Sequence, residues 1–191
     1  MNETLGSLFY LINKIFFLLR EIAGLKKHEG LEWWFSVASW TSGLVGLPFV
    51  SLLFFHQNDY IFAWLELGAG TPMAYGLILK CFGMSRAVPA WADRIVDGAI
   101  GFGLGYSICF LGGFVTIDQG LELAAVLIFL RANHCLAKDD RTGYLWFLPM
   151  FCAAGALLFR QGNDLFFLQQ VASAIIIVLA YLISKKAQAK K

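Results

Sequence analysis

Long apolar runs limit what this chain can fold into more than any other feature of its sequence. A helix needs roughly 20 mostly apolar residues to cross a hydrocarbon core of about 30 Å. Six segments meet that requirement: residues 33–55, 60–81, 95–117, 119–137, 143–160 and 164–184. Membrane-spanning β-strands would have about ten residues and would alternate apolar with polar side chains. The runs therefore predict an all-α membrane protein.

The composition is typical of a chain that folds in lipid. Of 191 residues, 59% are hydrophobic and 15% are charged, whereas soluble domains average about 45–50% apolar and about 25% charged residues. A net charge of +2 is too small to indicate a nucleic-acid-binding surface. We expect a single transmembrane domain over residues 1–191, embedded in a lipid bilayer and without a nucleic-acid partner. Formation of a homo-oligomer stays open.

A further segment, residues 5–25, is apolar around most of its circumference but carries Lys14, Arg20 and Glu21. Two structures are compatible with this pattern. The segment either spans the membrane or lies in the interface as an amphipathic helix. The first gives a seven-helix bundle, and the second gives six spans plus an interfacial helix. An internal repeat favours the first.

The basic residues predict the orientation of the chain. If the connections alternate between the two faces, one face receives only Arg160. The other face receives eleven: Lys26, Lys27, Lys80, Arg86, Arg94, Lys138, Arg141, Lys185, Lys186, Lys190 and Lys191. Because positive charge in short loops marks the cytoplasmic side, the C-terminus is expected inside and the N-terminus outside. The expected location is the bacterial cytoplasmic (inner) membrane, which the chain crosses several times.

Two segments of the chain resemble each other. Residues 52–62 (LLFFHQNDYIF) and 157–167 (LLFRQGNDLFF) agree at six of eleven positions without a gap, and each turns on Asn-Asp between two apolar runs. The two turns lie four predicted spans apart, so both copies point the same way. This predicts a parallel three-plus-one-plus-three repeat. Residues 5–81 form the first three-helix repeat, 95–117 the linker helix, and 119–184 the second repeat.

Polar side chains within the predicted spans are candidates for a substrate site, because a charge at mid-membrane costs roughly 2.5–3.5 kcal/mol unless it faces a cavity or a partner. Asp97, Asp118 and Asp164 lie near span starts, where carboxylates suit helix N-termini, and Arg131 can extend to the basic face. Glu66, Glu122 and Gln170 have no such explanation. We expect these three to line a central cavity. Secondary candidates are Trp40, Tyr75, Asn133 and Tyr181.

Signs of catalysis or of a metal site are weak in this sequence. The three histidines lie in separate loops or span ends without the spacing of metal ligands, and the four cysteines fall in or beside apolar segments, where packing is their usual role. No nucleophile elbow or phosphate loop is present. We therefore expect neither an enzyme nor a bound cofactor.

The predicted plan and some of its residues resemble the nicotinamide riboside transporter family (Pnu-type vitamin transporters). Leu65-Glu66 followed by Tyr75-Gly76 is similar to the family's Leu-Gln followed by Tyr-Gly at the same spacing. In the second repeat, the order of four residues is similar: Asp118, Trp146, Gln169 and Gln170. The chain departs from the family in having glutamate at position 66 and Leu77 where the family has tryptophan.

This resemblance implies facilitated transport of a small polar vitamin precursor, nicotinamide riboside or a related nucleoside, across the cytoplasmic membrane. Two other classes stay open. One is a sugar or metabolite facilitator of the same plan. The other is a membrane component that transports nothing, such as a sensor, an assembly partner or a channel-forming oligomer.

Overall fold

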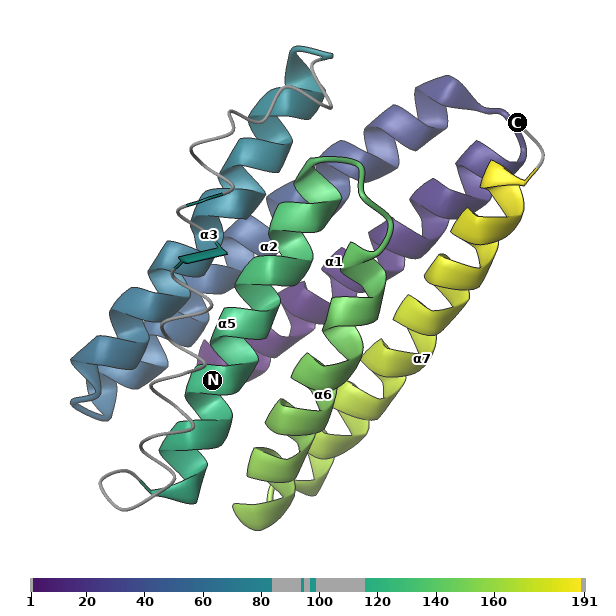
Figure 1. Cartoon of the computed structure of the whole chain (residues 1–191). Helices are drawn as coiled ribbons and strands as arrows, with labels where there is room; N and C mark the ends of the chain where they lie inside the picture. Colours follow the sequence, from purple (N-terminus) through teal and green to yellow (C-terminus); the bar gives the residue numbers. More distant parts are fainter. Residues whose placement is uncertain (1, 84–93, 95–96, 99–115, 190–191) are drawn as a thin grey trace.

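The computed structural model describes residues 2–83, 94, 97–98 and 116–189. Within this part of the chain it has six long helices (Figure 1). Their bounds are α1 Asn2–Leu25, α2 Glu29–His56, α3 Tyr60–Cys81, α5 Ile117–Ala137, α6 Gly143–Arg160 and α7 Asp164–Gln188. Each coincides to within a few residues with an expected apolar run. The expected linker helix, 95–117, lies almost wholly outside the described residues.

The all-α class is confirmed for the described residues, and four of their helices are long and apolar enough to cross a membrane. These are α2, α5, α6 and α7. Helices α1 and α3 have 24 and 22 residues and are therefore long enough, but they fall outside that group. In α1, Lys14, Arg20 and Glu21 are nevertheless buried against other helices. The count of seven spans stays a prediction.

The six helices form a ring in chain order. Helix α2 packs between α1 and α3, and α6 packs between α5 and α7. Contacts of α3 with α5 and of α1 with α7 close the ring. The described helices therefore surround a common centre, and α1 packs against both α2 and α7.

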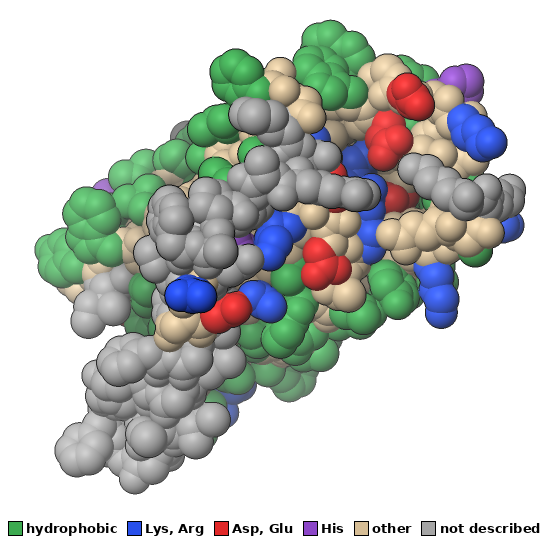
Figure 2. Space-filling model, turned by 45° about the horizontal axis from the view of Figure 1, so that its top comes forward, with side chains coloured by type: hydrophobic (Ala, Val, Ile, Leu, Met, Phe, Trp, Pro, Cys, Tyr) green, Lys and Arg blue, Asp and Glu red, His purple; other side chains and the backbone are tan. Residues whose placement is uncertain are grey.

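The connections separate into two ends of the bundle (Figure 1). Residues 26–28 and 138–142 lie at one end with the C-terminus, and residues 57–59 and 161–163 lie at the other. An ion pair between Lys80 and Asp139, 2.6 Å apart, joins α3 to the first of these ends. We call the end that holds residues 26–28, 138–142 and the C-terminus the basic end, because the described lysines and arginines of the basic face lie there, except Arg94. We call the other end the opposite end. Figure 2 shows charged side chains gathered over part of the surface, with hydrophobic side chains along its flanks.

The two Asn-Asp turns are similar in backbone geometry, but their register differs from the ungapped sequence alignment by one residue. That alignment pairs Asn58 with Asn163, whereas the left-handed residues are Asn58 (φ 59°) and Gly162 (φ 69°). The following residues, Asp59 and Asn163, precede the first turns of α3 and α7. Asparagine and glycine tolerate this conformation best, so both end a helix readily. Lys27 ends α1 with the same sign of φ, so turn geometry alone does not establish the repeat.

The acidic residues at helix starts do not all act as caps. Asp164 lies in the first turn of α7, and the capping position before it is Asn163. At the start of α5, the capping box is formed by Thr116 and Gln119. Asp118 instead pairs with Arg160, 2.6 Å away, at the opposite end. The expected placement of Asp118 and Asp164 at helix starts is confirmed, and both carboxylates lie where the helix dipole favours negative charge. Neither residue occupies the N-cap position itself.

Asp97 and Arg131 form an ion pair with each other. The Arg131 guanidinium also lies 5.9 Å from the ring centre of Trp146. Arg131 therefore has a direct acidic partner. The sequence instead suggested that its side chain extends to the basic face.

Candidate functional site

A cavity of about 190 Å³ lies at the centre of the ring. Every described helix contributes to its lining, which includes Ser7, Tyr10, Lys14, Val50, Phe54, Glu66, Glu122, Phe129, Met150, Phe151, Ala154, Leu158, Gln169, Gln170 and Ser173. This volume is smaller than the roughly 300–1,000 Å³ of pockets for drug-sized ligands. A compact solute therefore fits the cavity better than a drug-sized one.

Helix α1 presents one polar face to the cavity. Ser7, Tyr10 and Lys14 follow each other at intervals of three and four residues, the spacing that places side chains on one side of a helix. The Tyr10 hydroxyl donates a hydrogen bond to Oε2 of Glu66 on α3, at 3.2 Å. This bond connects the polar face of α1 directly with α3.

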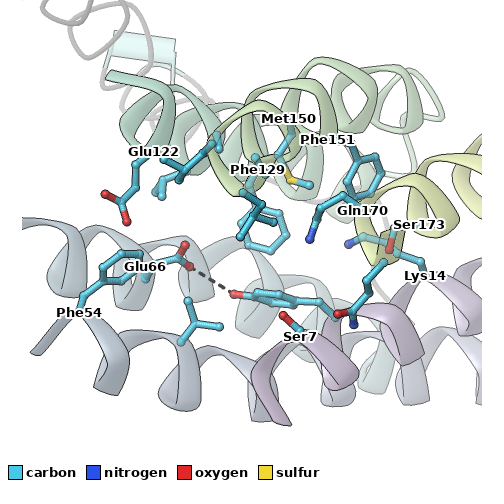
Figure 3. A pocket seen from close by; sticks show the side chains of 18 residues that line it. Ser7, Lys14, Phe54, Glu66, Glu122, Phe129, Met150, Phe151, Gln170 and Ser173 are labelled. Atoms are coloured by element: carbon cyan, nitrogen blue, oxygen red, sulfur yellow. Dashed lines mark hydrogen bonds between the residues drawn. The ribbon is translucent and has the colours of Figure 1, made fainter. Parts of the chain in front are cut away.

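Two carboxylates share one side of the cavity. Figure 3 shows Glu66 and Glu122 at the same end of the lining, with Lys14 at the other end. The two carboxyl groups come from α3 and α5, which pack against each other. Both carboxyl groups therefore lie toward the opposite end of the bundle.

The ammonium group of Lys14 lies at the deep end of the cavity. Its side chain is buried, with 2% of the residue exposed, and Nζ donates to Oδ1 of Asn13 at 2.7 Å. Nζ also lies 3.9 Å from the ring centre of Phe147 and 5.3 Å from that of Phe129. No carboxylate pairs with Lys14 among the described residues.

Four buried aromatic residues separate the cavity from the basic end. They form an aromatic plug: Phe17, Trp40, Tyr144 and Phe147. The ring of Phe17 meets those of Trp40 and Tyr144 edge-on, with centres 5.5 and 5.9 Å apart. The indole of Trp40 packs directly against Gly76. A Cβ at position 76 would lie 2.7 Å from the indole, so this packing requires glycine. The cavity lining instead reaches toward the last turns of α2 and α6 at the opposite end.

Beyond the plug, a buried ion network closes the basic end. Oε1 of Glu21 accepts hydrogen bonds from Arg20, from the Tyr144 hydroxyl at 2.7 Å and from Arg141 at 2.5 Å. Arg20 and Glu21 are 1% and 4% exposed. Arg141 also lies 3.8 Å from Glu32 on α2. The network therefore joins α1 to α2, to α6 and to the connection that precedes α6.

The structure brings together only part of the predicted site. Glu66, Glu122 and Gln170 all line the cavity. The four secondary candidates do not belong to its lining: Trp40, Tyr75, Asn133 and Tyr181.

Depth along the helix axis explains why Asn133 and Tyr181 lie outside the cavity. Asn133 follows Glu122 by eleven residues, and Tyr181 follows Gln170 by eleven, so the pairs share helix faces as expected. At 1.5 Å per residue, however, eleven residues carry the chain about 16 Å further along the helix axis. Asn133 is buried, and its side chain donates to the carbonyl of Phe129 at 2.8 Å. Shared faces alone did not predict a shared cavity.

The sequence analysis missed Ser7 and Tyr10. It treated Lys14 only as a charge that makes a membrane-spanning position of residues 5–25 less favourable. All three lie in the segment whose position was least certain. Their regular spacing together with a lysine was a signal of a polar helix face. This spacing identifies a helix face, but it does not identify the helix that packs against that face.

Within the described residues, no group of three or more histidine, cysteine, aspartate or glutamate residues could hold a metal ion. The cavity instead offers two carboxylates, one ammonium group, two amides and hydroxyls. These groups can bind and orient a polar solute through hydrogen bonds and charge. Comparison with protein-family models, curated proteins and solved structures gives no match to this chain.

Proposed function

We propose that this chain is a seven-span membrane facilitator that carries a small polar solute through the central cavity. The observation that carries the proposal is a central cavity that holds ionisable and amide side chains in a largely apolar lining, is lined by all six described helices and is closed at one end by the aromatic plug and the ion network. Transporters built from parallel repeats hold their substrate near the midplane between the two halves. The ring of two three-helix halves is compatible with that plan.

The substrate proposed from the sequence resemblance is nicotinamide riboside or a related nucleoside. Amide side chains suit such a solute, because Gln169 and Gln170 offer both donors and acceptors to its hydroxyl and carboxamide groups. The carboxylates of Glu66 and Glu122 suit its positive charge. The access from the opposite end, proposed to be extracellular, would admit the solute from outside.

Transport requires the basic end to open in turn. In the proposed cycle, the plug residues move apart and the contacts of Glu21 with Arg20 and Arg141 break. The cavity then releases its solute to the cytoplasm. A gate of this kind prevents the cavity from forming a continuous pore.

Replacement of Gln170 by alanine tests the binding site. The change removes a hydrogen bond worth about 0.5–1.5 kcal/mol, so affinity should fall roughly two- to twelvefold. The measurement is uptake of labelled nicotinamide riboside into proteoliposomes, together with thermal stabilisation of the purified protein by the same compound. Leu168→Ala, at an exposed position of α7, is the control and should leave both unchanged. Normal uptake by Gln170→Ala would contradict this placement of the site.

A panel of vitamins, nucleosides and sugars separates the proposal from its alternatives. Stabilisation by a nucleoside-type compound, with uptake, supports the proposed function. Stabilisation and uptake of a sugar instead would identify a sugar facilitator. Absence of both across the panel would favour a component that transports nothing.

Cysteine labelling tests the proposed orientation. In a cysteine-free background, Gln57→Cys and Gln161→Cys at the opposite end should react with an impermeant maleimide on intact cells. Lys26→Cys at the basic end should react only after the membrane is opened. All three positions are exposed. The reverse pattern would invert the orientation, and labelling of all three on intact cells would contradict the assignment of the two ends to opposite sides.

A further inference from the structure

Hydrogen bonds between α1 and α2 fix the position of the Lys14 side chain. The side chain of Asn13 donates through Nδ2 to the carbonyl of Ser39 at 2.6 Å and to its hydroxyl at 3.2 Å. These bonds from α2 fix the amide, so that its oxygen faces Nζ of Lys14 at 2.7 Å. The position of the ammonium group is therefore determined by two helices.

The hydrogen-bonding capacity of Lys14 is only partly used. An ammonium group has three N–H donors, and Asn13 accepts one of them. The rings of Phe147 and Phe129 cover part of the remaining surface, and cation–π contacts partly offset the cost of burial. Among the described residues, no acceptor meets the other two N–H groups.

A buried cation without a carboxylate partner is unfavourable for folding. Within the part of the chain that the structure describes, no ion network includes Lys14, whereas Arg20 and Arg141 share Glu21 at the basic end. Lys14 lies in the cavity lining, where a ligand can reach it. An anionic group of the ligand would supply the missing partner.

The two ends of the cavity carry ionisable groups of opposite type, the amine of Lys14 at one end and the carboxyl groups of Glu66 and Glu122 at the other. Glu122 lies seven residues before Phe129 on α5, a distance of about 10 Å along the helix axis, and Phe129 lies beside Lys14. The carboxylate of Glu66 is bonded to Tyr10, one turn of α1 nearer the opposite end than Lys14. Figure 3 shows this separation directly.

We propose that the cavity recognises a zwitterionic solute, whose carboxylate binds Lys14 at the deep end and whose cationic group lies beside Glu66 and Glu122. This inference rests on the proposed transport function and narrows its substrate class. A purely cationic solute such as nicotinamide riboside would leave Lys14 without a partner. Its analogue with a carboxylate in place of the carboxamide would satisfy both ends.

Matched pairs of compounds test this inference. Each pair differs only in a carboxylate or a carboxamide: nicotinate riboside and nicotinamide riboside, nicotinate and nicotinamide, L-alanine and L-alaninamide. Charge-assisted hydrogen bonds are worth about 1.5–3 kcal/mol. The wild-type protein should therefore bind the carboxylate member of at least one pair about tenfold or more tightly than the amide, by thermal shift and by uptake into proteoliposomes.

Lys14→Met should remove this preference, leaving less than a twofold difference between the members of the pair. Lys185→Met, at an exposed position of α7, is the matched control and should retain it. Lys14→Met should also unfold at the same temperature as the wild type or higher, because it removes a buried charge without a carboxylate partner. Lys80→Met, which breaks the pair with Asp139, should unfold at a lower temperature.

The outcomes distinguish the inference from the proposed function. Three outcomes overturn the inference that the solute is zwitterionic but leave the transport function intact. They are tighter binding of the amide member, equal affinity within every pair that binds, and a preference for the carboxylate that persists in Lys14→Met. A clear loss of stability in Lys14→Met would show a structural cation and also overturn it. If no compound of any pair binds or is transported, both proposals fail.

Discussion

Ala154→Trp should reduce uptake by at least about a hundredfold, which corresponds to ~2.8 kcal/mol. Ala154 faces the cavity from α6. An indole ring placed there would occupy much of a space of about 190 Å³ and would exclude the solute. Because the ring enters an existing cavity, the strain of about 1–3 kcal/mol that overpacking causes in a closed core should be small. Initial rates in proteoliposomes and the unfolding temperature measure the two effects.

Ala156→Trp is the matched control for this variant. Ala156 lies two residues further along the same helix and is exposed on the outside of the bundle. A tryptophan there would face lipid, and uptake should stay within about twofold of the wild type. Normal uptake by Ala154→Trp in a folded protein would show that solute does not pass through the central cavity. Equal loss in both variants would indicate a general effect of tryptophan on α6.

Glu21→Ala should lower the free energy of unfolding by about 3–5 kcal/mol, the usual cost of removing one partner from a buried ion pair. The carboxylate of Glu21 accepts hydrogen bonds from Arg20, Arg141 and Tyr144. Without it, the positive charge of Arg20 stays buried at 1% exposure, and one of its nitrogens already has no hydrogen-bond partner. Reversible unfolding in mixed detergent micelles measures the difference.

Asp118→Ala provides the comparison for Glu21→Ala. Asp118 pairs with Arg160 at 2.6 Å, but their side chains are 40% and 50% exposed. Exposed ion pairs contribute only about 0–1 kcal/mol, so the unfolding free energy should change little. A loss in Glu21→Ala no larger than that in Asp118→Ala would contradict a stabilising role of the buried ion network that joins α1 to Tyr144 and to the connection before α6.

The sequence by itself determined the six described helices, with their ends to within a few residues. Backbone groups in lipid must form their hydrogen bonds within the segment, so runs of about 20 apolar residues leave little choice besides helix. The two Asn-Asp turns, at residues 58–59 and 163–164, then mark where one helix stops and the next begins. The cost of burying polar groups identified Glu66, Glu122 and Gln170 by the same logic, because it depends on residue type and position within the run.

Only the tertiary structure decided which residues meet. Periodicity assigns a residue to a helix face, but it gives neither the neighbour of that face nor the depth at which two helices bring their side chains together. Trp40 packs in the plug because Gly76 on α3 leaves room for its indole. Glu21 and Arg141 are 120 residues apart in sequence and share one buried network. In an isolated membrane span, the charge of Lys14 would be unfavourable. It lines the cavity because the other five described helices enclose that space.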